Sequence, residues 1–164
     1  MQTININLDE HLPVGYSSNA ISIRTGNSSN ETLTHVVIGD DFIAGSSVSL
    51  RHWVVMPSRG LSLAQPMTVA SRRLPPIRQL RIGIGEYLAG LKLDACKLWR
   101  LGSDEPLPTK PAMRVGQWLA LLDSDTETAD YLVPIDAIVR VELSAVDNSL
   151  LGLGYSNNLA PSKN

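Results

Sequence analysis

Apolar and polar residues alternate with a period of two at the beginning of the chain. Ile4, Ile6 and Leu8 are separated by single polar residues, and Ile21 and Ile23 repeat the pattern. This period is typical of strands with one buried face, because successive side chains of a strand point to opposite faces. Both segments are therefore predicted to be half-buried strands.

Further segments rich in β-branched and aromatic residues continue this pattern. They are residues 34–38, 48–56, 67–70, 80–84, 115–122, 131–134 and 138–143. Clusters of glycine, proline, asparagine and aspartate lie between them, as expected for turns. Many short strands at this spacing predict a mainly β fold, either a sandwich or a barrel of antiparallel strands.

One segment, residues 86–100, fits a helix as well as a strand. Tyr87 and Leu91 are four residues apart, as on one face of a helix, whereas Leu91 and Leu93 fit the alternation of a strand. Gly90 would cost a helix interior roughly 1 kcal/mol relative to alanine, which favours the strand. One short helix near residues 86–100 remains the alternative.

The length of the chain, 164 residues, suits one ordinary domain with a core of its own. We expect a single β-rich domain over residues 1–147 and a C-terminal tail over residues 148–164, which is either flexible or docked through its leucines. The sequence contains no evident internal repeat.

The beginning of the chain does not resemble a signal peptide, and no apolar stretch is long enough to span a bilayer. Cys96 is the single cysteine, which excludes an internal disulfide and suits a reducing compartment. These features predict a soluble cytoplasmic protein with no membrane partner.

Charged residues are distributed unevenly along the chain. Residues 42–85 contain six arginines and His52 but no lysine, aspartate or glutamate. Of the 14 basic residues, eight therefore lie elsewhere, together with all 16 acidic ones. A guanidinium group binds phosphate or carboxylate through two parallel hydrogen bonds, and it also stacks on aromatic rings. This arginine window predicts an anionic partner.

The arginine window supplies the candidate binding residues. In a strand over residues 48–56, Arg51 and Trp53 would share a face, which suits the stacking of a nucleobase. Four arginines between residues 72 and 81 surround the rigid Pro75-Pro76 corner. The predicted anion-binding residues are Arg51, Trp53, Arg59, Arg72, Arg73, Arg78 and Arg81.

These residues predict a non-enzymatic binding or assembly module, with nucleic acid as the favoured partner. One alternative is a protein adaptor that contacts an acidic protein surface, or a homo-oligomer in which the acidic loop at residues 123–130 is the mate. A small hydrolase is a further alternative. The arginines could instead pair with acidic residues of the same fold, which is the ordinary fate of mixed surface charge.

No local motif predicts catalysis, a cofactor or a metal. Gly39-Asp40-Asp41 is typical of a tight turn, and neighbouring strand residues need not converge on one ion. The three histidines have no metal-ligand spacing, and Cys96 has no CxxC partner. A lone cysteine among apolar residues is most often a small buried side chain. We therefore expect no enzyme.

Two segments of the second half resemble the CheW family of chemotaxis coupling proteins. They are Leu107-Pro-Thr-Lys-Pro111 followed by Gly116, and residues 131–141. Members of that family are twin β-barrels that bridge receptors and kinases, so the resemblance implies a non-catalytic β adaptor. The Asn-Leu-Arg-Gly motif of the family is absent and the two segments occur in the wrong order for one barrel, so the chain is not assigned to the family.

Overall fold

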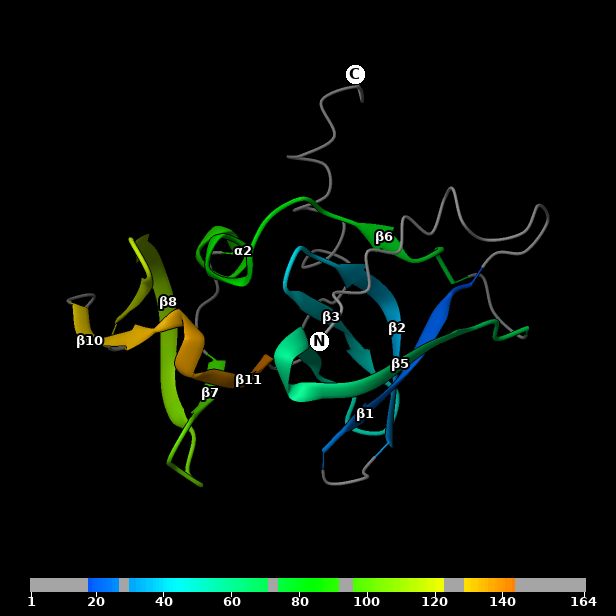
Figure 1. Ribbon diagram of the computed structural model, residues 1–164, viewed down its shortest axis with the longest axis horizontal. Helices are drawn as coiled ribbons and strands as arrows, with labels where there is room; N and C mark the ends of the chain where they lie inside the picture. The colour runs from blue at the N-terminus through cyan, green and yellow to red at the C-terminus, as the bar shows by residue number, and fades with distance from the viewer. Residues whose placement is uncertain (1–17, 27–29, 71–73, 92–95, 123–128, 144–164) are drawn as a thin grey trace, which may run out of the picture.

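The fold is mainly β, with short and mostly antiparallel strands and one α-helix, as the alternation predicts (Figure 1). This computed structural model describes residues 18–26, 30–70, 74–91, 96–122 and 129–143. The predicted strand at residues 4–8, residues 123–128 of the predicted acidic loop and the predicted tail at residues 148–164 lie outside them. Residues 129–130 of the predicted loop belong instead to a strand. No helix of the described part is long and apolar enough to cross a membrane.

The first half of the chain forms strands β1 to β6. Their bounds are β1 (Ala20–Thr25), β2 (Asn30–Ile38), β3 (Phe42–Ser47), β4 (Trp53–Pro57), β5 (Leu61–Met67) and β6 (Arg78–Gln79). The second half begins with helix α2 and continues with strands. Their bounds are α2 (Ile84–Leu91), β7 (Cys96–Arg100), β8 (Leu107–Val115), β9 (Trp118–Leu122), β10 (Ala129–Pro134) and β11 (Ile138–Leu143).

Ten of the eleven described strands form two units of five with the same connectivity, and β6 pairs with β2 outside this pattern. Along the sheet the order is β10-β9-β8-β7-β11-β4-β3-β2-β1-β5. In each unit the first four strands follow one another, and the fifth strand returns to pair with the first. The pair of β11 with β4 joins the units, and Figure 1 shows the first unit on the right and the second on the left.

The repeat extends to local irregularities. Each fourth strand ends at a proline, Pro57 or Pro134, followed by a 3-10 turn, η1 (Ser58–Gly60) or η2 (Ile135–Ala137). Each fifth strand then begins with a bulge against the first strand of its unit. The second and third strands of both units also share a bulge at the same place. The structure therefore contains an internal repeat, although the sequence shows none.

Two hydrophobic clusters lie on opposite faces of this sheet. One cluster fills the first unit and includes Ile21, Leu33 and Val54. The other fills the second unit and also covers the back of β3 and β4, through Phe42 and Trp53. Strand β4 is consequently buried on both faces, which explains its continuous apolar sequence.

Several predicted strands are confirmed and others are wrong. The predicted strands at residues 21–23, 34–38, 131–134 and 138–143 lie within β1, β2, β10 and β11. The predicted strand at residues 48–56 is a turn up to residue 52, where the chain reverses with Arg51 at a φ of 60°. The predicted strand at residues 115–122 is broken by Gly116, whose φ of 61° favours glycine.

Helix α2 confirms the alternative of one short helix near residues 86–100 and corrects the predicted strand at residues 80–84. Residues 86–91 are helical and β7 follows only at Cys96, while β6 ends at Gln79, so residues 80–84 do not form a strand. The side chain of Asp41 accepts a hydrogen bond from the backbone N–H of Ile84 at 2.8 Å, which satisfies a free donor at the helix start. This tertiary contact outweighs the low helix propensity of Gly85 and Gly90.

Candidate functional site

Those predicted anion-binding residues that the structure describes do not form one surface. Arg51 is exposed in the turn between β3 and β4. Arg78 and Arg81 are exposed on and after β6, which pairs with β2. Arg72 and Arg73 lie outside the described residues. Binding of an anion by the exposed arginines stays a prediction.

The prediction that Trp53 stacks on a nucleobase is wrong, because its side chain is fully buried. Strand β4 places the indole in the core of the second unit, where its Nε1–H donates a 3.2 Å hydrogen bond to the hydroxyl of Tyr87. Trp53 and Arg51 also do not share a strand face, since β4 begins at Trp53. Apolar and polar residues continue to alternate over residues 48–51 of the turn, so the pattern does not show that the strand begins only at Trp53.

Arg59 is engaged within the fold. Its Nη2 donates hydrogen bonds to the backbone carbonyls of Asp136 and Ile138, the latter at 2.6 Å. Arg59 belongs to η1 and Asp136 to η2, so this side chain links the equivalent 3-10 turns of the two units by hydrogen bonds. Arg59 is therefore a structural contact between the units.

A largely buried ion pair lies at the junction of the units. Arg140 of β11 binds both carboxylate oxygens of Glu31 in β2, at 2.9 and 3.0 Å, and its Nε contacts Glu142 at 2.7 Å. Burial acts to raise the pKa of Glu31, but the hydrogen bonds from Arg140 and Ser47 and the charge of Arg140 outweigh it and lower the pKa. This arginine lies outside the predicted window.

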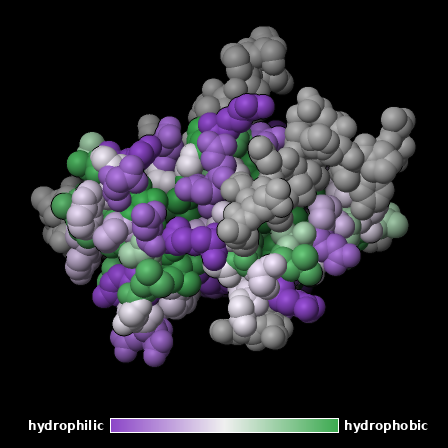
Figure 2. Space-filling view, in the orientation of Figure 1, coloured by the Kyte–Doolittle hydropathy of each residue, from purple (hydrophilic) through white to green (hydrophobic). Residues whose placement is uncertain are grey.

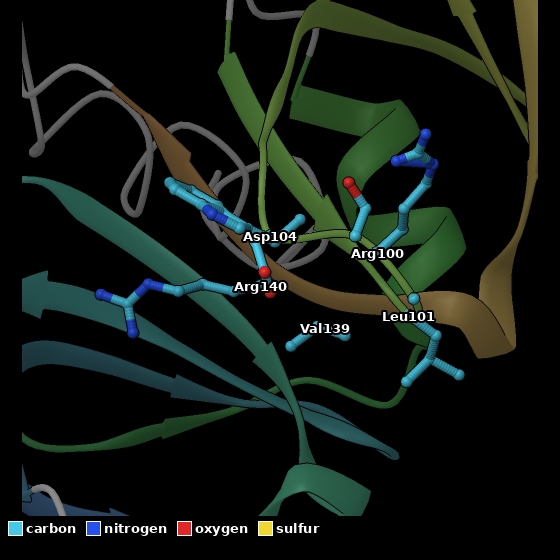
Figure 3. Close-up of a pocket in the computed structure, with 8 residues that line it drawn as sticks. Arg100, Leu101, Asp104, Val139 and Arg140 are labelled. Atoms are coloured by element: carbon cyan, nitrogen blue, oxygen red, sulfur yellow. The ribbon is translucent and has the colours of Figure 1, made fainter.

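A pocket of about 410 Å³ is lined by residues 99–104 with Val139 and Arg140. Figure 3 shows that Arg140 extends toward the strands of the first unit, whereas Arg100 extends the other way. The two guanidinium groups therefore do not converge on one ligand. The pocket combines arginine and apolar surface without a pair of groups suited to acid–base catalysis.

Cys96, His35 and Asp41 are further candidate chemical groups that the structure describes. Cys96 is buried, and burial raises the pKa of its thiol to about 12, so the thiolate nucleophile does not form at neutral pH. Burial also lowers the pKa of His35. Among the described residues no three histidine, cysteine or carboxylate side chains could hold a metal ion together. Asp41 occupies the predicted turn and holds the start of α2.

A more prominent feature is an apolar sheet surface on the second unit. Strands β8, β9 and β10 pair Val115 with Trp118, and Met113 with Ala120 and then Leu132. These five residues share the face that points away from the core of their unit, while Leu119 and Leu121 point into it. We call Met113, Val115, Trp118, Ala120 and Leu132 the second-unit face.

The second-unit face is exposed. The exposed fractions are 56% for Met113, 48% for Val115, 46% for Trp118 and 58% for Leu132, around the buried Ala120. None of the five side chains carries a charge. In Figure 2 hydrophobic residues lie among hydrophilic ones over the second unit, at the left. Contiguous apolar surface of this kind marks interaction sites in soluble proteins.

The first unit has an equivalent face. Phe42 pairs with Pro57 as Trp118 pairs with Pro134. Ala44 pairs with Val37 and Val55 as Ala120 pairs with Met113 and Leu132. We call this set the first-unit face, and its residues are Val37, Phe42, Ala44 and Val55. All of them are at most 2% exposed, because α2 and the second unit cover them.

Comparisons with known proteins give no match, whether with protein-family models, with curated proteins or with solved structures.

Sequence reasoning missed the second-unit face, although a signal for it exists. Residues 118–122 are apolar at every position, so this strand has two apolar faces. Such a run is typical of strands buried on both sides. In β9 the described residues bury Leu119 and Leu121 on one face, whereas on the other face they bury only Ala120 and leave Trp118 exposed, and only the strand pairing reveals this.

Proposed function

We propose that this chain is a non-catalytic protein-binding module and that a partner protein docks on the second-unit face. The observation that carries the proposal is the contrast between equivalent residues, since Phe42 is 1% exposed and Trp118 is 46% exposed. A sheet with an apolar outer face gains free energy when that face is removed from water. In the first unit this gain occurs within the chain. In the second unit the described residues leave most of this surface exposed, and a partner would provide the gain.

The composition of the second-unit face supports a protein partner. Tryptophan and methionine are enriched in protein interfaces, and tryptophan is frequent among the residues that contribute most of the binding energy. Trp118 lies beside Val115 and the end of β10, and Met113 and Leu132 flank Ala120. The absence of charge among the five residues favours a protein partner over nucleic acid, whose affinity rests on phosphate contacts.

Other observations agree with a module that binds rather than catalyses. The thiol of Cys96 is buried, and the guanidinium groups of Arg100 and Arg140 point apart. The proposal keeps the binding and assembly role predicted from the sequence and moves its surface from the arginine window to the second unit.

Site-specific photo-crosslinking in cells that naturally produce the protein tests this proposal. A photoreactive amino acid replaces Leu132 on the second-unit face or, as a matched control, Leu101, which is apolar and 66% exposed in the turn after β7. We expect a discrete crosslinked protein from position 132 and none from position 101. Trp118→Asp introduced together with the label at position 132 should abolish the product.

Two results would contradict the proposal. Equal crosslinking from positions 132 and 101 would show that the second-unit face has no special affinity. A product that survives Trp118→Asp would show that the contact does not involve this face. Circular dichroism of each variant confirms that the fold is intact, which is expected because Trp118 and Leu132 are exposed.

A further inference from the structure

The way in which the first-unit face is covered indicates what the second-unit face binds. Helix α2 packs beside β8 and β9 of the second unit, and the ring of its Tyr87 also packs on Phe42 of the first-unit face, with their centroids 4.6 Å apart and an angle of 33° between the ring planes. The Tyr87 hydroxyl also accepts the hydrogen bond from Trp53. Tyr87 and Leu88 are fully buried there. The first-unit face therefore accepts a buried aromatic side chain from a helix.

The turn before the third strand anchors the start of that helix. In the first unit this turn residue is Asp41, whose side chain accepts the N–H of Ile84. Its backbone carbonyl accepts the N–H of Ser58 at 2.8 Å, and the carbonyl of Gln117 accepts the N–H of Ile135 at 2.9 Å. Gln117 is thus the equivalent of Asp41. It is exposed, and its amide oxygen is also a hydrogen-bond acceptor.

We infer that the second-unit face binds an amphipathic helix of a partner protein, with an aromatic side chain over Trp118 in the place that Tyr87 takes over Phe42. The helix begins near Gln117 and lays its apolar stripe across Met113 and Leu132. This inference rests on the proposed function and specifies its partner. The recognition is of the helix-in-groove kind, in which anchors three, four and seven residues apart enter an apolar surface.

A second copy of the chain is a poorer occupant. Strand β5 is the last strand of the sheet at the end formed by the first unit. Its equivalent in the second unit is β11, which pairs with β4 of the first unit. Successive residues of a strand direct their backbone groups to alternate edges. Since the carbonyl of Met67 accepts a hydrogen bond from Asn19 on the β1 side, Pro66 faces the free edge. Proline has no N–H, so this edge lacks one of the donors that continued pairing would use, at Pro66.

A peptide with the sequence of α2 tests the inference, because the two faces are equivalent. The peptide spans residues 80–91 and carries a hydrocarbon staple between positions 86 and 90, which are both exposed in α2. The staple holds the helix, since so short a peptide is otherwise unfolded in water. The peptide is added to the full-length protein, and the indole N–H signals of Trp118 and Trp53 are followed by NMR.

We expect the Trp118 signal to shift on titration while the buried Trp53 signal stays in place. The same stapled peptide with Tyr87→Glu should bind about tenfold or more weakly, as for loss of a hot-spot residue. Leu132→Asp in the protein should weaken binding of the original peptide to the same extent. A stapled peptide that leaves the Trp118 signal unchanged, or one that binds equally well with Tyr87→Glu, would overturn the inference.

The crosslinking experiment separates this inference from the proposed function. If position 132 crosslinks to a partner but the peptide does not bind, the helical partner is wrong and the protein-binding function stands. If position 132 gives no crosslink, both are wrong. If light scattering of the purified protein shows an oligomer that Trp118→Asp dissociates, the occupant is a second copy, and the inference of a helix from another protein is overturned.

Discussion

The first-unit face and the second-unit face have equivalent strand pairing but differ in how much of each is exposed to solvent. Equivalent strand pairs place Phe42 and Trp118, and Ala44 and Ala120, at corresponding positions. The first face is covered by α2 and the second unit, whereas the second face is open to solvent. The difference supports the proposal that an apolar surface of this kind is a docking site.

The largest expected effect separates the two faces by stability. Phe42→Ala should lower the free energy of unfolding by about 3–5 kcal/mol, because it leaves a cavity beneath Tyr87. Trp118→Ala should change it by less than about 1 kcal/mol, since the side chain is half exposed. Urea denaturation measures both. Equal losses would mean that the second-unit face already belongs to the core.

The junction between the units should be the next most sensitive place. Glu31→Gln removes the charge that Arg140 contacts with two nitrogens, and we expect a loss of about 1.5–3 kcal/mol, as for hydrogen bonds to charged groups. Glu105→Gln, at an exposed position in the turn after β7, is the matched control and should be neutral. Thermal and urea unfolding measure the effect, and an unchanged stability in Glu31→Gln would contradict the role of this ion pair.

The same ion pair makes stability depend on pH. The pKa of Glu31 in the fold is below its ordinary value of 4.5, so the contribution of this carboxylate is fully present above pH 4.5 and is lost as the pH falls. The stability difference between wild type and Glu31→Gln should therefore shrink below pH 4.5. A difference that stays constant down to the acid limit of folding would contradict the lowered pKa.

The contact between α2 and the first-unit face can be weakened by one atom. Tyr87→Phe removes the hydroxyl that accepts the indole N–H of Trp53, and the buried donor left behind should cost about 1–2 kcal/mol. Tyr131→Phe, at an exposed tyrosine of β10, should have no effect. Urea denaturation of both variants provides the comparison. Equal stability of Tyr87→Phe and wild type would show that this hydrogen bond does not hold the helix.

The smallest expected effect concerns the corners of the units. Arg59→Ala removes the hydrogen bonds to the carbonyls of η2, with an expected loss of about 0.5–1.5 kcal/mol. Arg81→Ala, an exposed arginine of the same window, should be neutral and serves as the control. If both variants lose the same stability, Arg59 has no special role between the units.

Local patterns predicted the strands with one buried face but not the turns and the helix. The alternation at Ile21 and Ile23 reports one buried face and needs no distant partner. The start of α2, in contrast, depends on Asp41, which lies 43 residues earlier in the chain. The burial of Trp53 likewise depends on the core of the second unit. Long-range contacts of this kind leave no local pattern.

The candidate site was harder to predict than the fold. The charge distribution predicts a binding site in residues 42–85. In the structure, however, Arg59 donates hydrogen bonds to backbone carbonyls of the second unit, and Trp53 is buried in the core. The second-unit face consists of ordinary apolar residues from three strands, and only their pairing brings Met113, Trp118 and Leu132 together. The repeat is equally hidden, because equivalent positions such as Phe42 and Trp118 preserve apolar character and not identity.

Oxidation of methionine tests most directly whether the second-unit face is occupied. Met113 is 56% exposed, while Met67 is 37% exposed on β5 and Met56 is buried in β4. Brief oxidant treatment, with sulfoxide measured by mass spectrometry, compares the purified protein with the same protein inside the cells that produce it. We predict that Met113 is oxidised readily in the purified protein and several-fold more slowly in cells. The oxidation of Met67 relative to that of Met56 should be the same in both settings. Equal oxidation of Met113 in both settings would contradict a docking role for this face.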